Sequence, residues 1–408
     1  MKEIAVIGFG VVGGGVVSLI DECASHISEA VGEDVYVKYI LDLRDFPDSP
    51  YGDRVIHDAE TIFADPAVAL VVETMGGVHP ALEFSTRALS CGKHVVTSNK
   101  ELVAKHGAEL MALAKEKGVA YLYEASVGGG VPLIRSMRTS LAGDRIDSVS
   151  GILNGTTNYI LTRMRDGGIS FEEALSEAQQ LGYAEKDPSA DIHGFDAQRK
   201  IMILCAVATG YIVDESKVYT ETMSKITVED IEAARRLGGA VRLIGSFRRE
   251  DSGVAISVCP RIVFGNNPLS GINDVYNGMS VTSHLTGDVM YYGRGAGRYP
   301  TAGAVISDVI AALNGAYQRE SHPTWEGAPA DFVCDFADSH SRVYVRVSGA
   351  ARGEVLDSAG LLLGDVETPD GTPEGKTEFV TGMLSEKQIA EAIGALPGKV
   401  ESVLRLLI

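Results

Sequence analysis

The first twenty residues place the strongest constraint on the fold. Residues 4–7 are apolar, the stretch 8–15 contains five glycines, and an apolar run continues to Ile20. A strand, a G-x-G-x-x-G turn and a helix in this order let the backbone approach a pyrophosphate at the helix N-terminus. The sequence therefore predicts dinucleotide binding at the following residues: Gly8, Phe9, Gly10, Val11, Val12 and Gly13.

Up to residue 141 the pattern alternates between strands and helices. The expected strands are Val35–Leu41, Ala69–Gly77, His94–Thr97 and Ala120–Ser126, and the expected helices are Pro80–Cys91 and Glu101–Gly118. Alternation of this kind predicts parallel crossovers and a doubly wound α/β sheet. Ligands bind beyond the carboxyl ends of such strands, which adds four candidate cofactor residues: Thr74, Gly76, Ser98 and Lys100.

The end of the second expected strand leaves the choice of cofactor open. Asp42 is placed to accept a hydrogen bond from a ribose 2′-hydroxyl, which favours NAD. Arg44, two residues later, is suited to a 2′-phosphate, which favours NADP. Both side chains can also be ordinary loop charges, so the sequence predicts NAD(P) without choosing between the two forms.

The rest of the chain reads as a mixed α+β region followed by a small module. Expected strands are Ile146–Gly151, Leu243–Phe247, Ala255–Val263, Val275–Met279 and Val281–Tyr292, and expected helices are Phe171–Leu181, Asp196–Tyr211 and Thr301–Leu313. In the final part we expect a strand, glycine-rich turns, a strand, the helix Glu386–Ala395 and a last strand. The predicted domains are a Rossmann-type domain at 1–141 with 302–322, a catalytic and dimerisation domain at 142–301, a linker at 323–341, and an α+β module at 342–408.

The segment Gly182–Lys200 concentrates charge just before a buried helix. Asp196 and Lys200 are four residues apart and share one face of a helix, and the apolar run Ile201–Val207 follows at once. Charges at the start of a buried helix are costly unless they pair or serve a ligand. The alternative is an ordinary surface ion pair, but the buried continuation favours a functional site.

Composition excludes several classes of protein. The net charge of −19 offers no basic surface to nucleic acid or to an anionic membrane. The longest apolar run, near Ile201–Val213, is too short and too interrupted by glycine to cross a bilayer. The five cysteines have no C-x-x-C spacing, which indicates free thiols in a reducing cytoplasm. No leader is expected, since the first strand opens the sequence.

Five ordered segments carry a resemblance to homoserine dehydrogenases over residues 1 to about 320. They are Thr97–Lys100, Glu124–Pro132, Gly151–Ile160, Gly182–Lys200 and Gly293–Thr301. The resemblance implies reversible, NAD(P)-dependent interconversion of L-homoserine and L-aspartate 4-semialdehyde in threonine, methionine and isoleucine biosynthesis. The tail is similar to the ACT modules of many such enzymes, although it lacks their Asp-x-Pro-Gly-Val-Leu turn. It implies an amino-acid effector site in degenerate form.

The resemblance also implies roles for individual residues. Lys200 matches the proton-transfer lysine, and Lys100 matches the lysine between cofactor and substrate. Lysine can move protons near neutrality only where burial or a second cation lowers its pKa. For the substrate, the resemblance implies Glu185, Asp191 and Asp196 at the ammonium group, with Asp196 also orienting Lys200, and Gly155 and Thr156 at the carboxylate. Against the cofactor it implies Gly182, Glu185, Gly295 and Gly297. Around a monovalent cation, usually Na⁺ in the family, it implies Glu124, Val127, Gly129 and Val131.

Two further functions compete with this reading. A phosphorylating aldehyde dehydrogenase of the aspartate-semialdehyde type needs a thiolate nucleophile, for which Cys91 is the candidate near the nucleotide-binding edge. A non-catalytic NAD(P)-binding amino-acid sensor would bind the cofactor without turnover. The family resemblance further implies a homodimer or homotetramer and no fused kinase domain.

Overall fold

Two compact units make up the computed structural model, which describes residues 1–251, 253–319 and 324–407. Unit 1 comprises Met1–Asp147, Met202–Val213 and Thr282–Ala328, and unit 2 comprises Ser148–Ile201, Asp214–Val281 and Pro329–Ile408. Three elements begin in one unit and end in the other: β7 (Ile146–Ile152), α10 (Phe195–Thr209) and β12 (Tyr276–Ser283). Parts of the three predicted domains and of the linker, at residues 252, 320–322, 323 and 408, lie outside the described residues.

Unit 1 is built on a six-stranded parallel sheet in the order β3-β2-β1-β4-β5-β6. Its strands are β1 (Lys2–Ile7), β2 (Val35–Leu41), β3 (Val55–Ile56), β4 (Val68–Glu73), β5 (His94–Thr97) and β6 (Tyr121–Leu122). This is the order of a dinucleotide-binding fold, whose ligand lies where the connections diverge, between β1 and β4. The predicted doubly wound α/β domain is confirmed.

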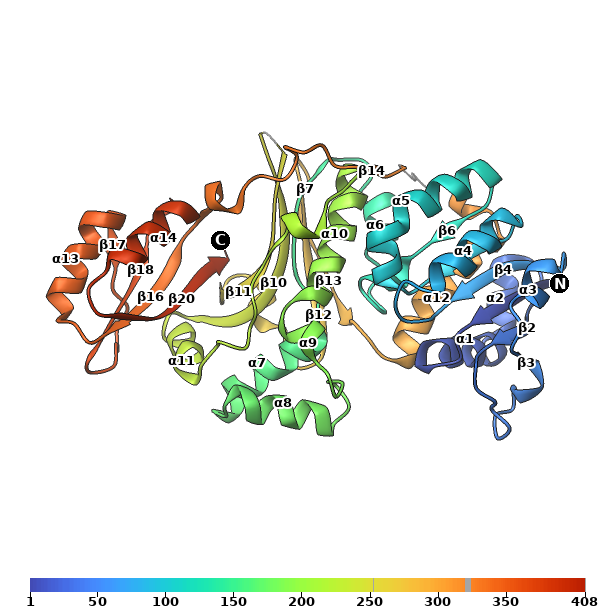
Figure 1. The fold of residues 1–408 in the computed structure, drawn as a ribbon, viewed down its shortest axis with the longest axis horizontal. Helices are drawn as coiled ribbons and strands as arrows, with labels where there is room; N and C mark the ends of the chain where they lie inside the picture. Colours follow the sequence, from blue (N-terminus) through green and yellow to red (C-terminus); the bar gives the residue numbers. More distant parts are fainter. Residues whose placement is uncertain (252, 320–323, 408) are drawn as a thin grey trace. The chain divides into compact units, whose positions relative to one another are not determined.

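Helices cover both faces of this sheet (Figure 1). The unit contains α1 (Val11–Glu22), α2 (Ala24–Val31), α3 (Glu60–Ala64), α4 (Ala81–Ser90), α5 (Lys100–Lys117), α6 (Ile134–Arg138) and α12 (Arg298–Leu313), with three short or peripheral strands, β8 (Tyr211–Ile212), β13 (Gly287–Arg294) and β14 (Glu326–Gly327). The apolar faces of α1 and α12 pack together on β1, β4 and β5, where Val16, Ile20 and Val305 are buried. The chain returns to the first sheet through α12.

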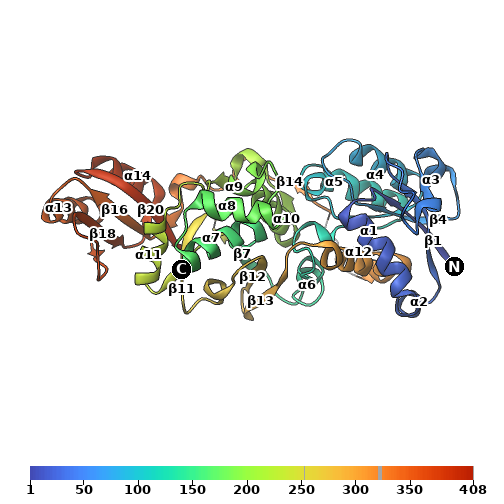
Figure 2. The same ribbon diagram turned by 90° about the horizontal axis from the view of Figure 1, so that it is seen from below.

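Unit 2 places its helices on a mainly antiparallel sheet. Its strands follow the order β12-β7-β10-β11-β20-β16-β18-β17, and β9 lies beside β11. The bounds are α7 (Gly155–Gly167), α8 (Phe171–Gln180), α9 (Ser189–Ile192), β9 (Tyr219–Thr220), α11 (Val228–Arg236), β10 (Gly239–Glu250) and β11 (Gly253–Phe264). Helices α7 and α8 lie side by side in both views (Figures 1 and 2). They share a core with α11 and the sheet.

The C-terminal part continues the sheet of unit 2. Its elements are β15 (His340–Ser341), β16 (Val343–Ser348), α13 (Arg352–Leu363), β17 (Val366–Glu367), β18 (Lys376–Thr381), β19 (Leu384–Ser385), α14 (Glu386–Ala395) and β20 (Lys399–Leu407). β16, α13, β17, β18, α14 and β20 form a βαββαβ arrangement, and β20 pairs with β11 in parallel. The predicted module at 342–408 therefore shares its sheet with the preceding part. Its identity as an ACT module stays a prediction.

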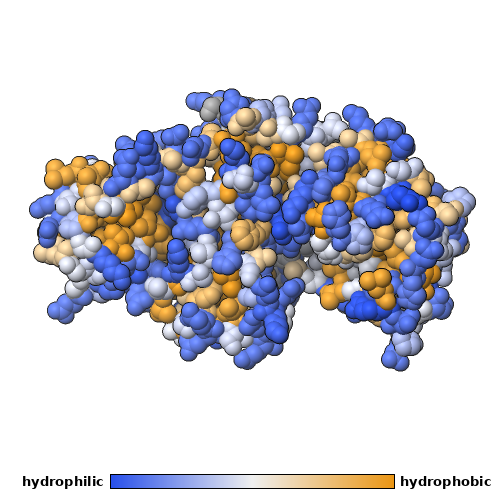
Figure 3. Space-filling model, in the orientation of Figure 1, coloured by the Kyte–Doolittle hydropathy of each residue, from blue (hydrophilic) through white to orange (hydrophobic). Residues whose placement is uncertain are grey.

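Side chains of β16 alternate between two cores, as the period of a strand requires. Val343 and Val345 pack under α13 and α14, whereas Tyr344 faces the core of α7, α8 and α11. Helix α13 leaves Leu361 and Leu362 exposed, at 88% and 45%. Figure 3 shows an apolar area on the surface of this C-terminal part.

Three predictions of elements are wrong. The break expected at residue 280 does not exist, because β12 continues to Ser283 and the turn lies before β13 begins at Gly287. Helix α12 begins at Arg298, three residues earlier than expected, since Gly297 at φ +115° forms its N-cap. The glycine-rich turns expected after β16 contain the helix α13, whose glycines lie at its start, at Gly360 and after its end. Glycine marks turns only statistically, and packing overrides it here.

Among the helices in the described part of the chain, none combines the length and apolar character needed to cross a bilayer.

Candidate functional site

The glycine turn of unit 1 fits a phosphate-binding loop. Gly8 has φ +93°, a conformation that other residues rarely adopt. A Cβ atom on Gly13 would lie 1.9 Å from the carbonyl oxygen of Gly8, so only glycine lets α1 start this close to β1. Gly10 is the N-cap residue of α1 and has no side chain to bond the first N–H groups of the helix. A Cβ atom built at Gly10 would meet no atom within 4 Å. The first turn of α1 is therefore accessible to an anion.

Asp42 and Arg44, the two candidate determinants of the cofactor, bind each other. Asp42 accepts the Phe9 N–H at 2.8 Å and the Arg44 Nε at 3.0 Å. Burial raises the pKa of Asp42, but the hydrogen bonds from Arg44 and Phe9 outweigh it and hold the pKa at about 2. Arg44 would have to leave Asp42 to bind a 2′-phosphate. A steady-state comparison of NADH with NADPH decides between the two predicted cofactor forms.

The other candidate cofactor residues of unit 1 lie at the ends of β4 and β5. Thr74 donates its hydroxyl to the Gly8 carbonyl at 2.8 Å, which joins β4 to the glycine turn. Open space surrounds Gly76 where a side chain would project. Ser98 follows β5, and Lys100 is the first residue of α5, after the N-cap Asn99. Thr74 and Gly8 are thus brought together as the sequence predicts.

In unit 2 the predicted Asp196–Lys200 pair forms within α10. The Lys200 Nζ lies 2.8 Å from the Asp196 carboxylate and donates to the Leu153 carbonyl at 2.7 Å. Both side chains are buried. A buried pair of this kind persists because each charge meets a partner with good geometry. It is not the ordinary surface ion pair that was the alternative.

Asn154 is a residue of this cluster that the sequence reasoning missed. Its Nδ2 donates to Asp191 at 2.7 Å and to Asp196 at 2.8 Å, while its Oδ1 caps α7 by accepting the Thr157 N–H at 2.9 Å. A sequence signal for the cap exists, because asparagine is a typical N-cap residue just before a helix. Only the fold shows that the same amide bridges two carboxylates.

The remaining substrate candidates lie around the start of α7. A Cβ on Gly155 would lie 2.6 Å from the Val275 carbonyl, so glycine is needed there. The Thr156 hydroxyl donates to the Tyr183 carbonyl at 2.6 Å. The proton that the prediction assigns to the substrate carboxylate is therefore already used in this bond. Gly182 has φ +74° with open space around it, and Glu185 is exposed. The structure brings Asp191, Asp196 and Lys200 together through Asn154.

The predicted cation loop contains a buried glutamate that also caps a helix. Glu124 accepts the N–H groups of Leu133, Ile134 and Arg135 at 2.7, 2.9 and 2.6 Å and so caps the start of α6. Burial raises the pKa of Glu124 above its ordinary value. A carboxylate has about four acceptor positions, so these three donors leave one for a cation. The predicted cation site, Glu124 with the carbonyl groups of Val127, Gly129 and Val131, stays a prediction.

The second predicted glycine pair lies against this loop. A Cβ on Gly129 would lie 2.2 Å from the Gly295 carbonyl, and the Gly130 N–H donates to the Arg294 carbonyl at 3.1 Å. Gly297, at φ +115°, starts α12. These glycines are explained by close packing within unit 1, and their predicted contact with the cofactor stays a prediction.

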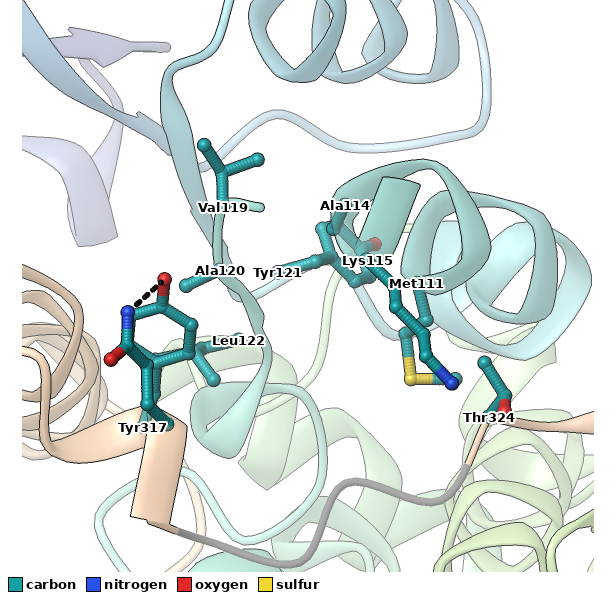
Figure 4. Close-up of a pocket in the computed structure, with 10 residues that line it drawn as sticks. Met111, Ala114, Lys115, Val119, Ala120, Tyr121, Leu122, Tyr317 and Thr324 are labelled. Carbon is teal, nitrogen blue, oxygen red and sulfur yellow. Dashed lines mark hydrogen bonds between the residues drawn. The ribbon is translucent and has the colours of Figure 1, made fainter. Parts of the chain in front are cut away.

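A pocket of about 280 Å³ in unit 1 lies apart from all these residues. Met111, Lys115, Tyr121, Tyr317 and Thr324 contribute to its lining (Figure 4). None of the predicted site residues lines it. The candidate site therefore rests on the clusters described above and not on this pocket.

Comparison with known proteins agrees with the fold. A family model described as homoserine dehydrogenase matches residues 132–310, and one described as the homoserine dehydrogenase NAD binding domain matches residues 8–124. A homoserine dehydrogenase of Synechocystis is 42% identical over 79% of this chain and 75% of the relative. That of Pseudomonas aeruginosa is 39% identical over 97% of this chain and 95% of the relative.

Solved structures give the same result. A homoserine dehydrogenase from Thiobacillus denitrificans superposes with a TM-score of 0.90 at 32% identity, covering 99% of this chain and 98% of the other. An archaeal homoserine dehydrogenase in complex with NADPH superposes with a TM-score of 0.65 at 28% identity, covering 76% of this chain and 97% of the other.

A parallel sheet with a glycine turn, joined to a second unit with a buried lysine–carboxylate cluster, defines an NAD(P)-binding oxidoreductase. The chain belongs to the homoserine dehydrogenase family. Its activity is the interconversion of L-homoserine and L-aspartate 4-semialdehyde. The aldehyde dehydrogenase and sensor alternatives are not favoured, and Cys91 is the exposed residue that ends α4.

Proposed function

We propose that Lys200 transfers the proton in the homoserine dehydrogenase reaction and that Asp196 holds it in place. The observation that carries this proposal is the buried contact of the Lys200 Nζ with Asp196 at 2.8 Å and with the Leu153 carbonyl at 2.7 Å. The two acceptors fix the position of the Lys200 side chain. From there Lys200 would give a proton to the aldehyde oxygen in one direction and take the hydroxyl proton in the reverse direction.

The substrate has an ammonium group and a carboxylate, and unit 2 offers a partner for each. Asp191, with Glu185 nearby in sequence, would bind the ammonium group, and the first turn of α7 at Gly155 and Thr156 would bind the carboxylate. The carboxylate of Asp191 is oriented by Asn154. Because the Thr156 hydroxyl donates to Tyr183, its backbone N–H is the donor we assign to the substrate.

The cofactor would lie on the glycine turn of unit 1, which fits its phosphates. When bound, its nicotinamide accepts a hydride from the alcohol carbon or returns it to the aldehyde. Gly8–Gly13 would hold the pyrophosphate, Asp42 or Arg44 the ribose, and Thr74, Gly76 and Ser98 the nicotinamide half, with Gly182, Glu185, Gly295 and Gly297 as further contacts. Lys100, at the start of α5, would lie between cofactor and substrate.

Replacement of Lys200 tests the proton-transfer role. Lys200→Ala should lower the maximal rate at least about a hundredfold, the range of general acid–base groups, with NAD(P)H affinity nearly unchanged. Because removal of one partner from a buried pair costs about 3–5 kcal/mol, circular dichroism must show that the variant is folded. Lys225→Ala, at an exposed lysine of the same unit, is the matched control. Near-normal turnover in Lys200→Ala would make the ion pair structural.

For the cation we propose the site that the sequence indicates. The carbonyl oxygens of Val127, Gly129 and Val131 suit a monovalent ion such as Na⁺, and the Glu124 carboxylate, which also caps α6, would be the charged ligand. No step of the reaction is assigned to this ion. Titration of the cofactor-free protein with NaCl and with choline chloride, followed by thermal unfolding, tests it. Stabilisation by choline equal to that by Na⁺ would contradict a specific site.

Family membership supports the wider setting of the activity. We propose that the enzyme acts in threonine, methionine and isoleucine biosynthesis in the cytoplasm, as a homodimer or homotetramer. The βαββαβ arrangement at the C-terminus supports an amino-acid effector there. Light scattering tests the assembly. Activity measured with and without threonine tests the effector.

A further inference from the structure

Three neighbouring strands of unit 1 end at the same level, and a buried glutamate lies where they end. In the parallel register Ile7 of β1 lies beside Glu73 of β4, and Glu73 lies beside Thr97 of β5. Glu73 and Thr97 are 1% and 0% exposed. A carboxylate this deep needs hydrogen-bond donors, because burial without them is costly.

Glu73 obtains hydrogen-bond donors from two chain segments at the candidate cofactor edge. Its Oε1 accepts the Met75 N–H at 2.7 Å, and its Oε2 accepts the Thr97 hydroxyl at 2.5 Å. The first contact fixes the loop Thr74–Gly77. The second leads into the β5–α5 connection, where Ser98 and Lys100 lie.

The chain of hydrogen bonds continues through Asn99 and returns to the first loop. Thr97 accepts the Asn99 N–H at 2.9 Å, and the Asn99 Nδ2 donates to the Gly77 carbonyl at 2.7 Å. The Asn99 Oδ1 caps α5 by accepting the Leu102 N–H at 3.1 Å. The start of α5 is thus joined to both ends of the loop Thr74–Gly77.

Thr97 both accepts and donates in this chain of hydrogen bonds, and only a hydroxyl can do both. It accepts from the Asn99 backbone and donates to Glu73, so its proton is oriented. A side chain with two oxygens fits the other side, because the Met75 N–H and the Thr97 hydroxyl meet different oxygens of Glu73. An amide at position 73 would offer only one acceptor oxygen.

We infer that Glu73, acting through Thr97 and Asn99, is a positioning residue that sets the loop Thr74–Gly77 and the start of α5 relative to each other. Neither Glu73 nor Thr97 is among the predicted ligand-binding residues. The inference rests on the proposed roles of Thr74, Gly76 and Lys100 in cofactor and substrate binding. A displacement of these groups by a fraction of an ångström lowers both affinity and rate.

Two substitutions at Thr97 separate the hydroxyl from the shape of the side chain. Thr97→Val keeps the volume and loses the hydroxyl, whereas Thr97→Ser keeps the hydroxyl and loses a methyl group. The dissociation constants for NADH and NADPH follow from nicotinamide fluorescence, and kcat and the KM for aspartate 4-semialdehyde follow from steady-state kinetics. Amide hydrogen exchange at Met75 and Asn99 in the cofactor-free protein reports the loops directly.

We expect Thr97→Val to raise the cofactor dissociation constant and to lower kcat by at least tenfold each, with faster exchange at both amides. Thr97→Ser should stay within threefold of the wild type. A lower melting temperature in Thr97→Val with affinity and kcat within threefold of the wild type would overturn the inference, because it would assign Thr97 to stability alone. An equal loss in Thr97→Ser would also overturn it.

Glu73→Gln keeps the test decisive if Thr97→Val does not fold. The glutamine has the same size and no charge, and it can satisfy one donor but not both. We expect at least a fivefold loss of cofactor affinity, and wild-type affinity would overturn the inference. The Lys200→Ala measurement is made with Thr97 and Glu73 intact, so failure of the proposed proton-transfer role is detected separately.

Discussion

Two buried carboxylates, Asp196 of unit 2 and Glu73 of unit 1, are stabilised by different partners. Asp196 meets the Lys200 ammonium group at 2.8 Å and the Asn154 amide at 2.8 Å. Glu73 meets a hydroxyl and a backbone N–H, both neutral donors. Because burial outweighs these bonds, the pKa of Glu73 rises to about 7. The two sites therefore differ in charge, because Asp196 pairs with a cation and Glu73 is held by neutral donors.

The comparison of Asp196 with Glu73 is tested most directly at Asn154, where we expect the largest effect of a substitution. Asn154→Asp would place a third carboxylate within hydrogen-bond distance of Asp191 and Asp196. Since like charges at this distance cannot all remain ionised, we expect kcat/KM for the semialdehyde to fall about a thousandfold. Asn154→Ser keeps a side chain that caps α7 and loses the bridging amide. Steady-state kinetics of both variants separates the effect of losing the amide bridge from the effect of losing the helix cap.

We expect Asn154→Ser to lose about tenfold in kcat/KM while its melting temperature stays close to that of the wild type. Full activity in Asn154→Ser would mean that the bridge does not orient the acids.

The second effect concerns stability as a function of pH in unit 1. The folded pKa of Glu73, about 7, lies above the ordinary value of 4.5, so the folded state holds the proton more tightly than the unfolded state. Its contribution to stability is complete below about pH 4.5 and is lost as the pH rises through 7. The shift corresponds to at most about 3 kcal/mol, since one pKa unit is about 1.36 kcal/mol.

Urea unfolding of Glu73→Gln at pH 5 and pH 8 measures this contribution. The decline in stability between these values should be smaller in Glu73→Gln than in the wild type. Glu29→Gln, at an exposed glutamate of α2, serves as the matched control and should follow the wild type. An unchanged decline in Glu73→Gln would mean that another group titrates here.

The sequence predicts the Asp196–Lys200 pair but not the cluster around Glu73, and the reason is physical. Asp196 and Lys200 are four residues apart, so the helix period alone brings them together. Glu73 and Thr97 come from two strands that pair only in the folded sheet, Asn99 is the N-cap of the helix that follows the second strand, and no local period relates Glu73 to the other two. The glycine turn at Gly8–Gly13 was predictable because its steric requirement is local. The cap at Glu124 was not, since its donors begin nine residues later at Leu133.

The boundaries of helices and strands are also predictable only where the signal is local. Both ends of the strand Val35–Leu41 were predicted, since turn residues lie on both sides of it. Helix α13 was missed because Gly353 and Gly360 suggest turns, whereas the buried Val355, Ala359 and Leu363 hold the helix on the sheet. Burial against a distant strand is not visible in a local pattern, and it decides such cases.

The smallest effect is expected at the edge of the cofactor site, where the ion pair is exposed. Arg44 is 65% exposed as a side chain, so solvent screens its pair with Asp42 and the pair contributes little to stability. Arg44→Ala should leave the melting temperature nearly unchanged. If Arg44 leaves Asp42 to bind the 2′-phosphate, the variant should lower kcat/KM for NADPH by up to about tenfold while NADH is unaffected. Arg54→Ala, at an arginine that pairs with Asp21, is the control for loss of a positive charge in unit 1. An equal loss with both cofactors would show that Arg44 only orients Asp42, and the ribose contact would then belong to Asp42 alone.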